Sequence, residues 1–172
     1  MIRRPPRSTL SSSSAASDVY KRQTSVNALE VFCKQLNYSP VVFEAFNDDR
    51  PIYHTTGMMS LGQETAFICS ESIKDQKDIK HIHKLFGVSE RKIIELSTAQ
   101  MNQFAGNVLE VENTKGQSHL IMSEKAYQSL EASQIQSISK SSKIIPIPLD
   151  TIEKYGGGSA RCMIAEIFLQ KT

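Results

Sequence analysis

The chain has 172 residues, 40% of them hydrophobic, with three cysteines and a formal net charge of +2. This length suits one domain with a hydrophobic core, and no apolar run reaches the roughly 20 residues that cross a bilayer. Residues 1–23 hold five of the 20 basic and one of the 18 acidic residues, so the remainder carries 15 basic and 17 acidic residues. A mildly acidic body argues against the basic surface with which proteins bind nucleic acid.

Residues 1–23 are predicted to be disordered. Pro5-Pro6 and the run Ser11–Ser14 interrupt any periodicity, and the stretch has few apolar side chains to bury. An excess of arginine and serine is typical of an organellar transit peptide, but an amphipathic stripe is missing. The string also resembles translated sequencing-adapter DNA, and we favour this artefactual origin. The folded domain is therefore expected within residues 24–172.

Elements of the first half are predicted from apolar spacing and turn residues. One apolar helical face, ending near Asn37, is formed by Leu29, Phe32, Cys33 and Leu36. Strands are predicted at residues 41–46, 65–69 and 92–96, with a turn at 47–51 and an irregular segment at 52–59. Ser72 is expected to cap a helix that runs to about Phe86 and stops at Gly87.

The second half is predicted to repeat this organisation. Ser97 is expected to cap a short turn, and a bend at residues 105–107 leads into a strand through Val111. A hairpin turn at 113–116 joins a strand at 118–122, and Ser123 starts the next helix. Residues 144–148 read as an edge strand because their prolines cannot donate to a ladder. Asp150 is expected to cap a turn through Tyr155, and a final buried strand is predicted at 163–169.

The order strand, strand, helix, strand thus occurs about twice, with a period of roughly 50 residues. Repeats of one such unit indicate an α/β fold whose sheets are arranged around a centre. Two units and a final strand would not close a ring, so the domain is expected to be incomplete. Its open sheet edges would then favour self-association.

The three cysteines form no close pair, which favours reduced thiols in a cytosol-like compartment. Cys33 and Cys69 lie within apolar patterns and are expected in the core. His81 and His83 share a predicted helix at a spacing that points them to different faces, so a shared metal is not expected. We predict neither a metal nor an organic cofactor.

Cys162 directly follows Arg161 and the glycine run Gly156–Gly158. Glycines let backbone amides approach a ligand, and a neighbouring cation favours a thiolate. From residue types alone, a thiolate nucleophile and an inert cysteine after a glycine turn are equally supported. A phosphate-binding loop is disfavoured because a strand, not a helix, is expected to follow.

Three polar residues, His54, Asn107 and Cys162, follow strand ends or interrupt apolar segments. If each repeat directs one loop toward a common axis, these residues meet there. Together they outline a Cys–His hydrolase in which His54 exchanges protons with a leaving group or a water.

Four segments resemble the C-terminal half of the amidinotransferase-like pentein superfamily: IYHTTGMM, MNQFAGNVLEV, LIMSEKAYQSL and TIEKYGGGSARCMIAEIFL. The most similar branch is the citrulline-utilisation hydrolases related to arginine deiminases. The resemblance extends over about residues 28–169, and GGGSARCM is its most specific part. It implies an α/β propeller of five ββαβ modules, of which this chain holds two to three, with the active site on the pseudo-symmetry axis.

The resemblance also implies roles for single residues. Cys162 matches the nucleophile, which attacks a guanidino or ureido carbon and forms a covalent S-alkyl intermediate. His54 matches the general acid/base that protonates the leaving amine and then activates water. The loop that contains Gly157, Gly158 and Arg161 matches the segment that holds the nucleophile at the substrate.

Two further positions of the resemblance concern the substrate. Asn107 matches an inward loop position, where a substrate contact and a purely structural bend are both open. Thr56 departs from the pattern, since deiminases carry His-x-Asp here and this branch usually His-x-Asn. A neutral threonine cannot pair with a guanidinium as a carboxylate does, which favours a ureido substrate such as citrulline, or lost activity.

The sequence therefore predicts a cytoplasmic cysteine hydrolase that acts on a C–N bond of a citrulline- or arginine-like amino acid. Its expected partner is this small molecule, with no nucleic acid and no membrane. The superfamily's N-terminal modules, which bring acidic substrate-binding residues, have no counterpart in the sequence, so little turnover is expected from this chain alone. The alternative is a non-catalytic member of the same fold that acts as an interaction module.

Overall fold

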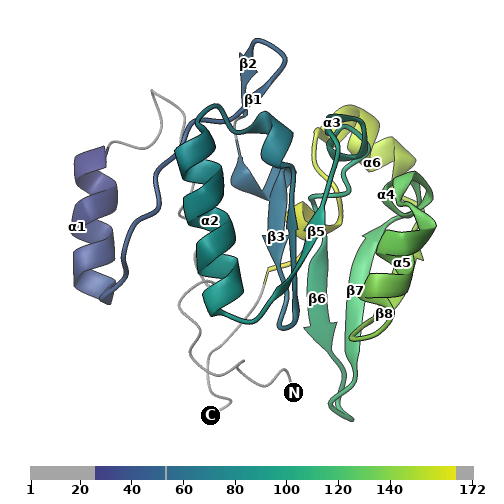
Figure 1. Cartoon of the computed structure of the whole chain (residues 1–172). Coiled ribbons are helices and arrows are strands. Elements are labelled where there is room, and N and C mark those ends of the chain that lie inside the picture. Colours follow the sequence, from purple (N-terminus) through teal and green to yellow (C-terminus); the bar gives the residue numbers. More distant parts are fainter. Residues whose placement is uncertain (1–25, 53, 166–172) are drawn as a thin grey trace.

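The computed structural model describes residues 26–52 and 54–165. Two three-stranded sheets form its body, with helix α2 beside the first sheet and α4 and α5 beside the second (Figure 1). A helix, α1 (Val26–Leu36), and a small hairpin of β1 (Phe46–Asn47) and β2 (Arg50–Pro51) precede them. The predicted α/β class is confirmed, whereas the arrangement of the units as propeller modules stays a prediction.

The first sheet has the order β3-β4-β5, with β3 antiparallel and β5 parallel to β4. Strand β4 is buried at all of its positions, as expected for a central strand rich in apolar residues. A parallel neighbour requires a long crossover, which here runs through η2 and α2. The bounds are β3 Met59–Leu61, β4 Thr65–Ile68, η2 Ser70–Ser72, α2 Gln76–Val88 and β5 Lys92–Glu95.

The second sheet repeats this topology with the order β6-β7-β8, again antiparallel and then parallel. The Asn113 side chain accepts the backbone N–H groups of Lys115 and Gln117 and shapes the hairpin turn between β6 and β7. Ser123 caps α4 as predicted, because its hydroxyl accepts the Ala126 N–H at 3.1 Å. The bounds are β6 Leu109–Glu112, β7 Ser118–Ser123, α4 Glu124–Ser129, α5 Ala132–Ile138 and β8 Lys143–Ile147.

The two units are joined by α3 (Thr98–Met101) and share one hydrophobic core. Ser97 caps α3 in a reciprocal capping box with Gln100, whose amide also donates to Gln134 Oε1 at 2.7 Å. Large side chains with less than 2% exposure come from both units: Phe67, Ile68, Phe86, Leu96, Leu120, Met122 and Ile138. Burial of each such side chain contributes about 1.5–3 kcal/mol. Because the core contains side chains of both units, the units stabilise one another.

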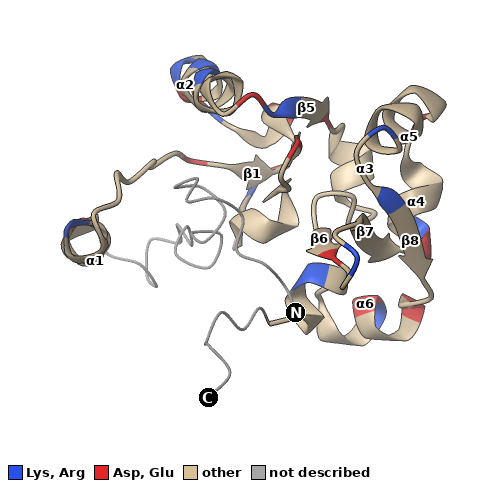
Figure 2. Cartoon of the chain, turned by 90° about the horizontal axis from the view of Figure 1, so that it is seen from below, with Lys and Arg blue, Asp and Glu red and all other residues tan. Residues whose placement is uncertain are grey.

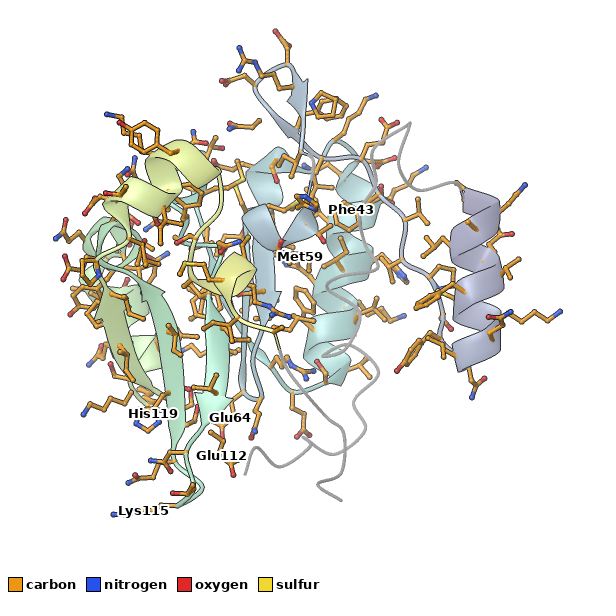
Figure 3. The ribbon with its side chains drawn as sticks, turned by 180° about the vertical axis from the view of Figure 1, so that it is seen from behind. Phe43, Met59, Glu64, Glu112, Lys115 and His119 are labelled. Carbon is orange, nitrogen blue, oxygen red and sulfur yellow. The ribbon has the colours of Figure 1, made fainter. Side chains whose placement is uncertain are left out.

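Strands β3 and β6 run in the same direction, and their carboxyl ends lie at one end of the molecule. Figure 3 shows Glu64, just after β3, beside Glu112 at the end of β6. The labelled Met59, where β3 begins, lies toward the opposite end of the sheets. The segments that lead into β3 and β6 therefore lie together at that opposite end.

Two predicted elements of the first half are wrong in detail. Residues 41–46 form no continuous strand: only Phe46 belongs to β1, and Ala45 makes an isolated bridge with Ile73. The helix after β4 is capped by Asp75, which accepts the Lys77 N–H, and not by Ser72. The Ser72 hydroxyl donates instead to Cys69 O at 2.6 Å, within the turn η2.

The predictions for the C-terminal segment also need correction. Residues 150–156 form a helix, α6 (Asp150–Gly156), whose N-cap is Leu149 without a side-chain bond, so Asp150 is not its cap. Residues 160–163 form a 3-10 turn, η3 (Ala160–Met163), and not the start of a buried strand. The rest of the strand predicted at 163–169 lies largely outside the described residues.

Helix α1 ends where predicted, but its apolar face does not have the predicted burial. Of its apolar face only Cys33 is buried, at 6% exposure, whereas Phe32 and Leu36 are 45% and 50% exposed. Figures 1 and 2 both show α1 standing away from the two sheets. None of the helices in the described part of the chain combines the length and apolar character needed to cross a membrane.

Candidate active site

Cys162 lies in the turn η3, directly after the glycine loop that ends α6. Gly157 ends the helix with a φ of 69°, a left-handed conformation that favours glycine. A Cβ on Gly158 would lie 3.0 Å from Cys162 Cβ and 3.1 Å from its Sγ, so any larger residue here would have to displace the cysteine side chain slightly. The Cys162 N–H donates to Ser159 O at 3.0 Å, and the side chain remains exposed. The loop therefore presents the thiol at the surface.

Asn107 lies in the bend before β6 and contacts Cys162 directly. Its side chain is only 2% exposed, and its Nδ2 lies 3.1 Å from Cys162 Sγ. Its Oδ1 accepts the backbone N–H of Arg161 at 3.0 Å and that of Cys162 at 3.4 Å. The Arg161 guanidinium turns back to Ile164 O, at 3.2 Å. One amide thus holds both the sulfur and the backbone of the turn that carries it.

The segment that leads into β3 meets the same amide. Asn107 Nδ2 also donates to Thr56 O at 2.9 Å, within the 3-10 turn η1 (Thr55–Gly57). A Cβ on Gly106 would lie 2.8 Å from Gly57 O and from the Met58 carbonyl carbon. The two lead-in segments are therefore in direct backbone contact, and only glycine fits at position 106.

The structure brings together five of the predicted site residues. Cys162, Arg161 and the Thr56 carbonyl meet at Asn107, and Gly158 packs against the cysteine. Thr56 contributes its backbone oxygen here rather than its side chain. Gly157 shapes the loop, but open space surrounds it.

His54 is the N-cap residue of η1 and is exposed. It stands two residues before the carbonyl that Asn107 holds, so the turn that carries His54 is tied to the turn that carries the cysteine. A direct pairing of the imidazole with Cys162 stays a prediction.

Two site residues were not predicted from the sequence, Ser159 and Glu153. Ser159 is fully buried, and its hydroxyl donates to Glu153 Oε1 at 2.6 Å, across the glycine loop. Glu153 is 5% exposed, and its Oε2 is buried without a hydrogen-bond partner among the described residues. The sequence carries no signal for this pair, because the burial of Ser159 and Glu153 is visible only in the structure.

The other two cysteines differ from Cys162 in their surroundings. Cys69 is fully buried, and this burial raises the pKa of its thiol above 9.0. Cys33 is also buried, so Cys162 is the exposed cysteine of the chain. Among the described residues, no group of His, Cys, Asp and Glu has the arrangement of a metal site.

The repeated ββαβ unit and the cysteine held after a glycine loop place the chain in the amidinotransferase-like pentein superfamily. The sequence profile of eukaryotic N,N dimethylarginine dimethylhydrolases matches residues 14–169. The chain belongs to this family. No curated protein sequence matches it.

Solved structures of ArgZ, an arginine dihydrolase from the ornithine-ammonia cycle in cyanobacteria, share the fold. The product-bound N-terminal domain has a TM-score of 0.61 and 18% identity, over 81% of this chain and 46% of that domain. A cysteine-to-serine mutant bound to substrate gives a TM-score of 0.60 and 18% identity, over 80% and 46%. Apo ArgZ gives 0.62 and 19% identity, over 88% of this chain and 23% of ArgZ. The chain thus spans about half the length of the related domain.

Proposed function

We propose that this chain carries the nucleophile of a cysteine hydrolase that cleaves a C–N bond of a guanidino or ureido amino acid. One observation carries the proposal: the exposed Cys162 thiol meets the turn that follows His54 through a single buried amide. Family membership supports the reaction class, since dimethylarginine is a guanidino amino acid. The ArgZ structures bound to substrate and product support a small-molecule ligand of the same kind.

The proposed reaction has two steps. The Cys162 thiolate forms a bond to the guanidino or ureido carbon, and the C–N bond to the departing amine breaks as His54 gives that amine a proton. His54 then takes a proton from water, whose oxygen adds to the same carbon. The C–S bond breaks, and its electron pair returns to the sulfur.

Thr56 bears on the choice between the two substrate classes. A neutral side chain at this position offers a guanidinium no countercharge, which supports a ureido substrate such as citrulline. The family's own substrate supports a guanidino group. The two classes differ in charge, and an experiment can separate them on that basis.

The test is alkylation of the full chain with 2-chloroacetamidine, which is cationic, and with 2-chloroacetamide, its neutral counterpart. Mass spectrometry of the digested protein reports labelling at each cysteine, with the denatured chain as the reference for an unassisted thiol. We expect Cys162 to react faster in the folded chain than in the denatured one, and the buried Cys33 and Cys69 to react slowly. Preference for the cation would indicate a guanidino substrate, and preference for the neutral reagent a ureido one.

His54→Gln extends the same experiment. Chloride leaves without a proton, so this variant should keep the labelling of Cys162 while losing any hydrolysis of dimethylarginine, arginine or citrulline. If folded Cys162 reacts with both reagents no faster than the denatured chain, the nucleophile assignment is wrong. The non-catalytic interaction module is then the better description.

A further inference from the structure

We propose that Asn107 is a catalytic residue that donates a hydrogen bond to the Cys162 sulfur, and not a ligand of the substrate. The inference rests on the proposed function, because it assigns a role at the same nucleophile. It follows from the burial of this side chain, at 2% exposure, and from the partners of its amide.

The amide has no hydrogen-bonding capacity left for a substrate. A carboxamide offers two N–H donors and two oxygen lone pairs. The donors go to Thr56 O at 2.9 Å and Cys162 Sγ at 3.1 Å, and the oxygen accepts from the N–H groups of Arg161 and Cys162. A substrate contact at Asn107 would have to break one of these four bonds.

The orientation of the amide is fixed by the same contacts. Two backbone N–H groups, from Arg161 and Cys162, converge on Oδ1. A flipped amide would point its own N–H groups at these donors and its oxygen at Thr56 O, so its hydrogen bonds to all three groups would be lost. The nitrogen must therefore face the sulfur, so Asn107 acts as a donor there.

A donor at this position assists the sulfur in both proposed steps. A hydrogen bond to an ionised acceptor is roughly twice as strong as one between neutral groups. Asn107 therefore stabilises the thiolate before attack, and again when the C–S bond breaks and the electron pair returns to sulfur. Its bond to Thr56 O keeps the turn after His54 in register with the nucleophile during this cycle.

The test compares Asn107→Asp and Asn107→Ala with a matched control, Asn113→Ala. Aspartate keeps the acceptor for the two backbone N–H groups but replaces the donors with oxygen. Asn113 is an exposed asparagine whose side chain also makes several bonds, to Lys115 and Gln117. It belongs to the hairpin whose tip, marked by Lys115 in Figure 3, lies at the end of the sheets away from Met59.

We expect both Asn107 variants to lower the alkylation rate of folded Cys162 by about tenfold or more, the loss that removal of a charge-assisted bond produces. Asn113→Ala should leave that rate unchanged. A wild-type rate in Asn107→Asp overturns the proposal, and the proposed function survives that result if wild-type Cys162 still reacts faster than the denatured chain.

A measurement on the wild type covers the case in which the Asn107 variants do not fold. Alkylation converts the sulfur into a thioether, a weaker acceptor. The side-chain amide resonances of Asn107 in the NMR spectrum should therefore shift on alkylation, while those of Asn113 stay in place. Unchanged Asn107 resonances in the alkylated protein overturn the proposal.

Discussion

The bond between Ser159 and Glu153 makes a strong prediction about stability, because both partners are buried. Ser159 is 0% and Glu153 5% exposed, the donor and acceptor are 2.6 Å apart, and the second carboxylate oxygen already lacks a partner among the described residues. Ser159→Ala would leave the whole carboxylate without a donor. An unsatisfied buried acceptor costs about 1–3 kcal/mol, with more for a charged group.

We therefore expect Ser159→Ala to lower the free energy of unfolding by about 2–3 kcal/mol. Adding Glu153→Leu should recover part of this loss, because the double variant removes the unpaired carboxylate. Ser133→Ala is the matched control: the Ser133 hydroxyl also donates to a glutamate, Glu131, but this pair is exposed and 3.4 Å long. The control should change stability by less than about 0.5 kcal/mol.

Urea unfolding followed by circular dichroism measures all three differences. Equal effects of Ser159→Ala and Ser133→Ala would refute the reasoning from burial. A double variant as unstable as Ser159→Ala would show that the unpaired carboxylate is not the source of the loss.

Two further predictions concern the contact between the lead-in segments and the acid range of stability. Gly106→Ala should destabilise the fold by about 1–3 kcal/mol, because the new Cβ meets backbone atoms of the facing segment that cannot move aside. Gly57→Ala is the control, since open space surrounds that position, and it should leave the thermal unfolding nearly unchanged. Similar melting temperatures for the two alanine variants would contradict this. Hydrogen bonds from the backbone N–H and hydroxyl of Thr98 lower the pKa of Glu71 below 4.5. The stability that these bonds give the folded state is therefore complete above that pH, and it is lost as the pH falls through the lowered pKa. The melting temperature of Thr98→Val should therefore be lower than that of the wild type at neutral pH and approach it in acid; a gap that stays constant with pH would rule out this linkage.

The sheets could be predicted from the sequence because their signals are local. The hairpin between β6 and β7 carries its own turn residues, and Ser97 and Ser123 each precede a helix whose first turn they cap. Ser72 shows where such signals fail. Both Ser72 and Asp75 are good caps, and the choice depends on Ser72 donating to Cys69 O, which no spacing in the sequence reveals.

The candidate site divides in the same way. The meeting of Cys162 with Asn107 was predicted from the repeat, because equivalent loops of repeated units lie on one side of the fold. The bond between Glu153 and Ser159 was not, since it depends on how the glycine loop folds back over α6. Residues 41–46 were misassigned because their strand propensity is high, but a neighbouring strand that could pair with them along their length is not present in the described part of the chain.

The geometry of the candidate site is itself a consequence of the repeat. Thr56 and Asn107 are 51 residues apart, Asn107 and Cys162 are 55 apart, and the first two lie just before the first strand of their unit. Because β3 and β6 run side by side in one direction, the segments that lead into them must meet at the same end. Cys162 joins them one repeat further along the chain. Each repeat thus supplies one segment. No single unit contains the sulfur together with its donor, or Asn107 together with the turn that it fixes. The proposed chemistry therefore depends on the contact between units.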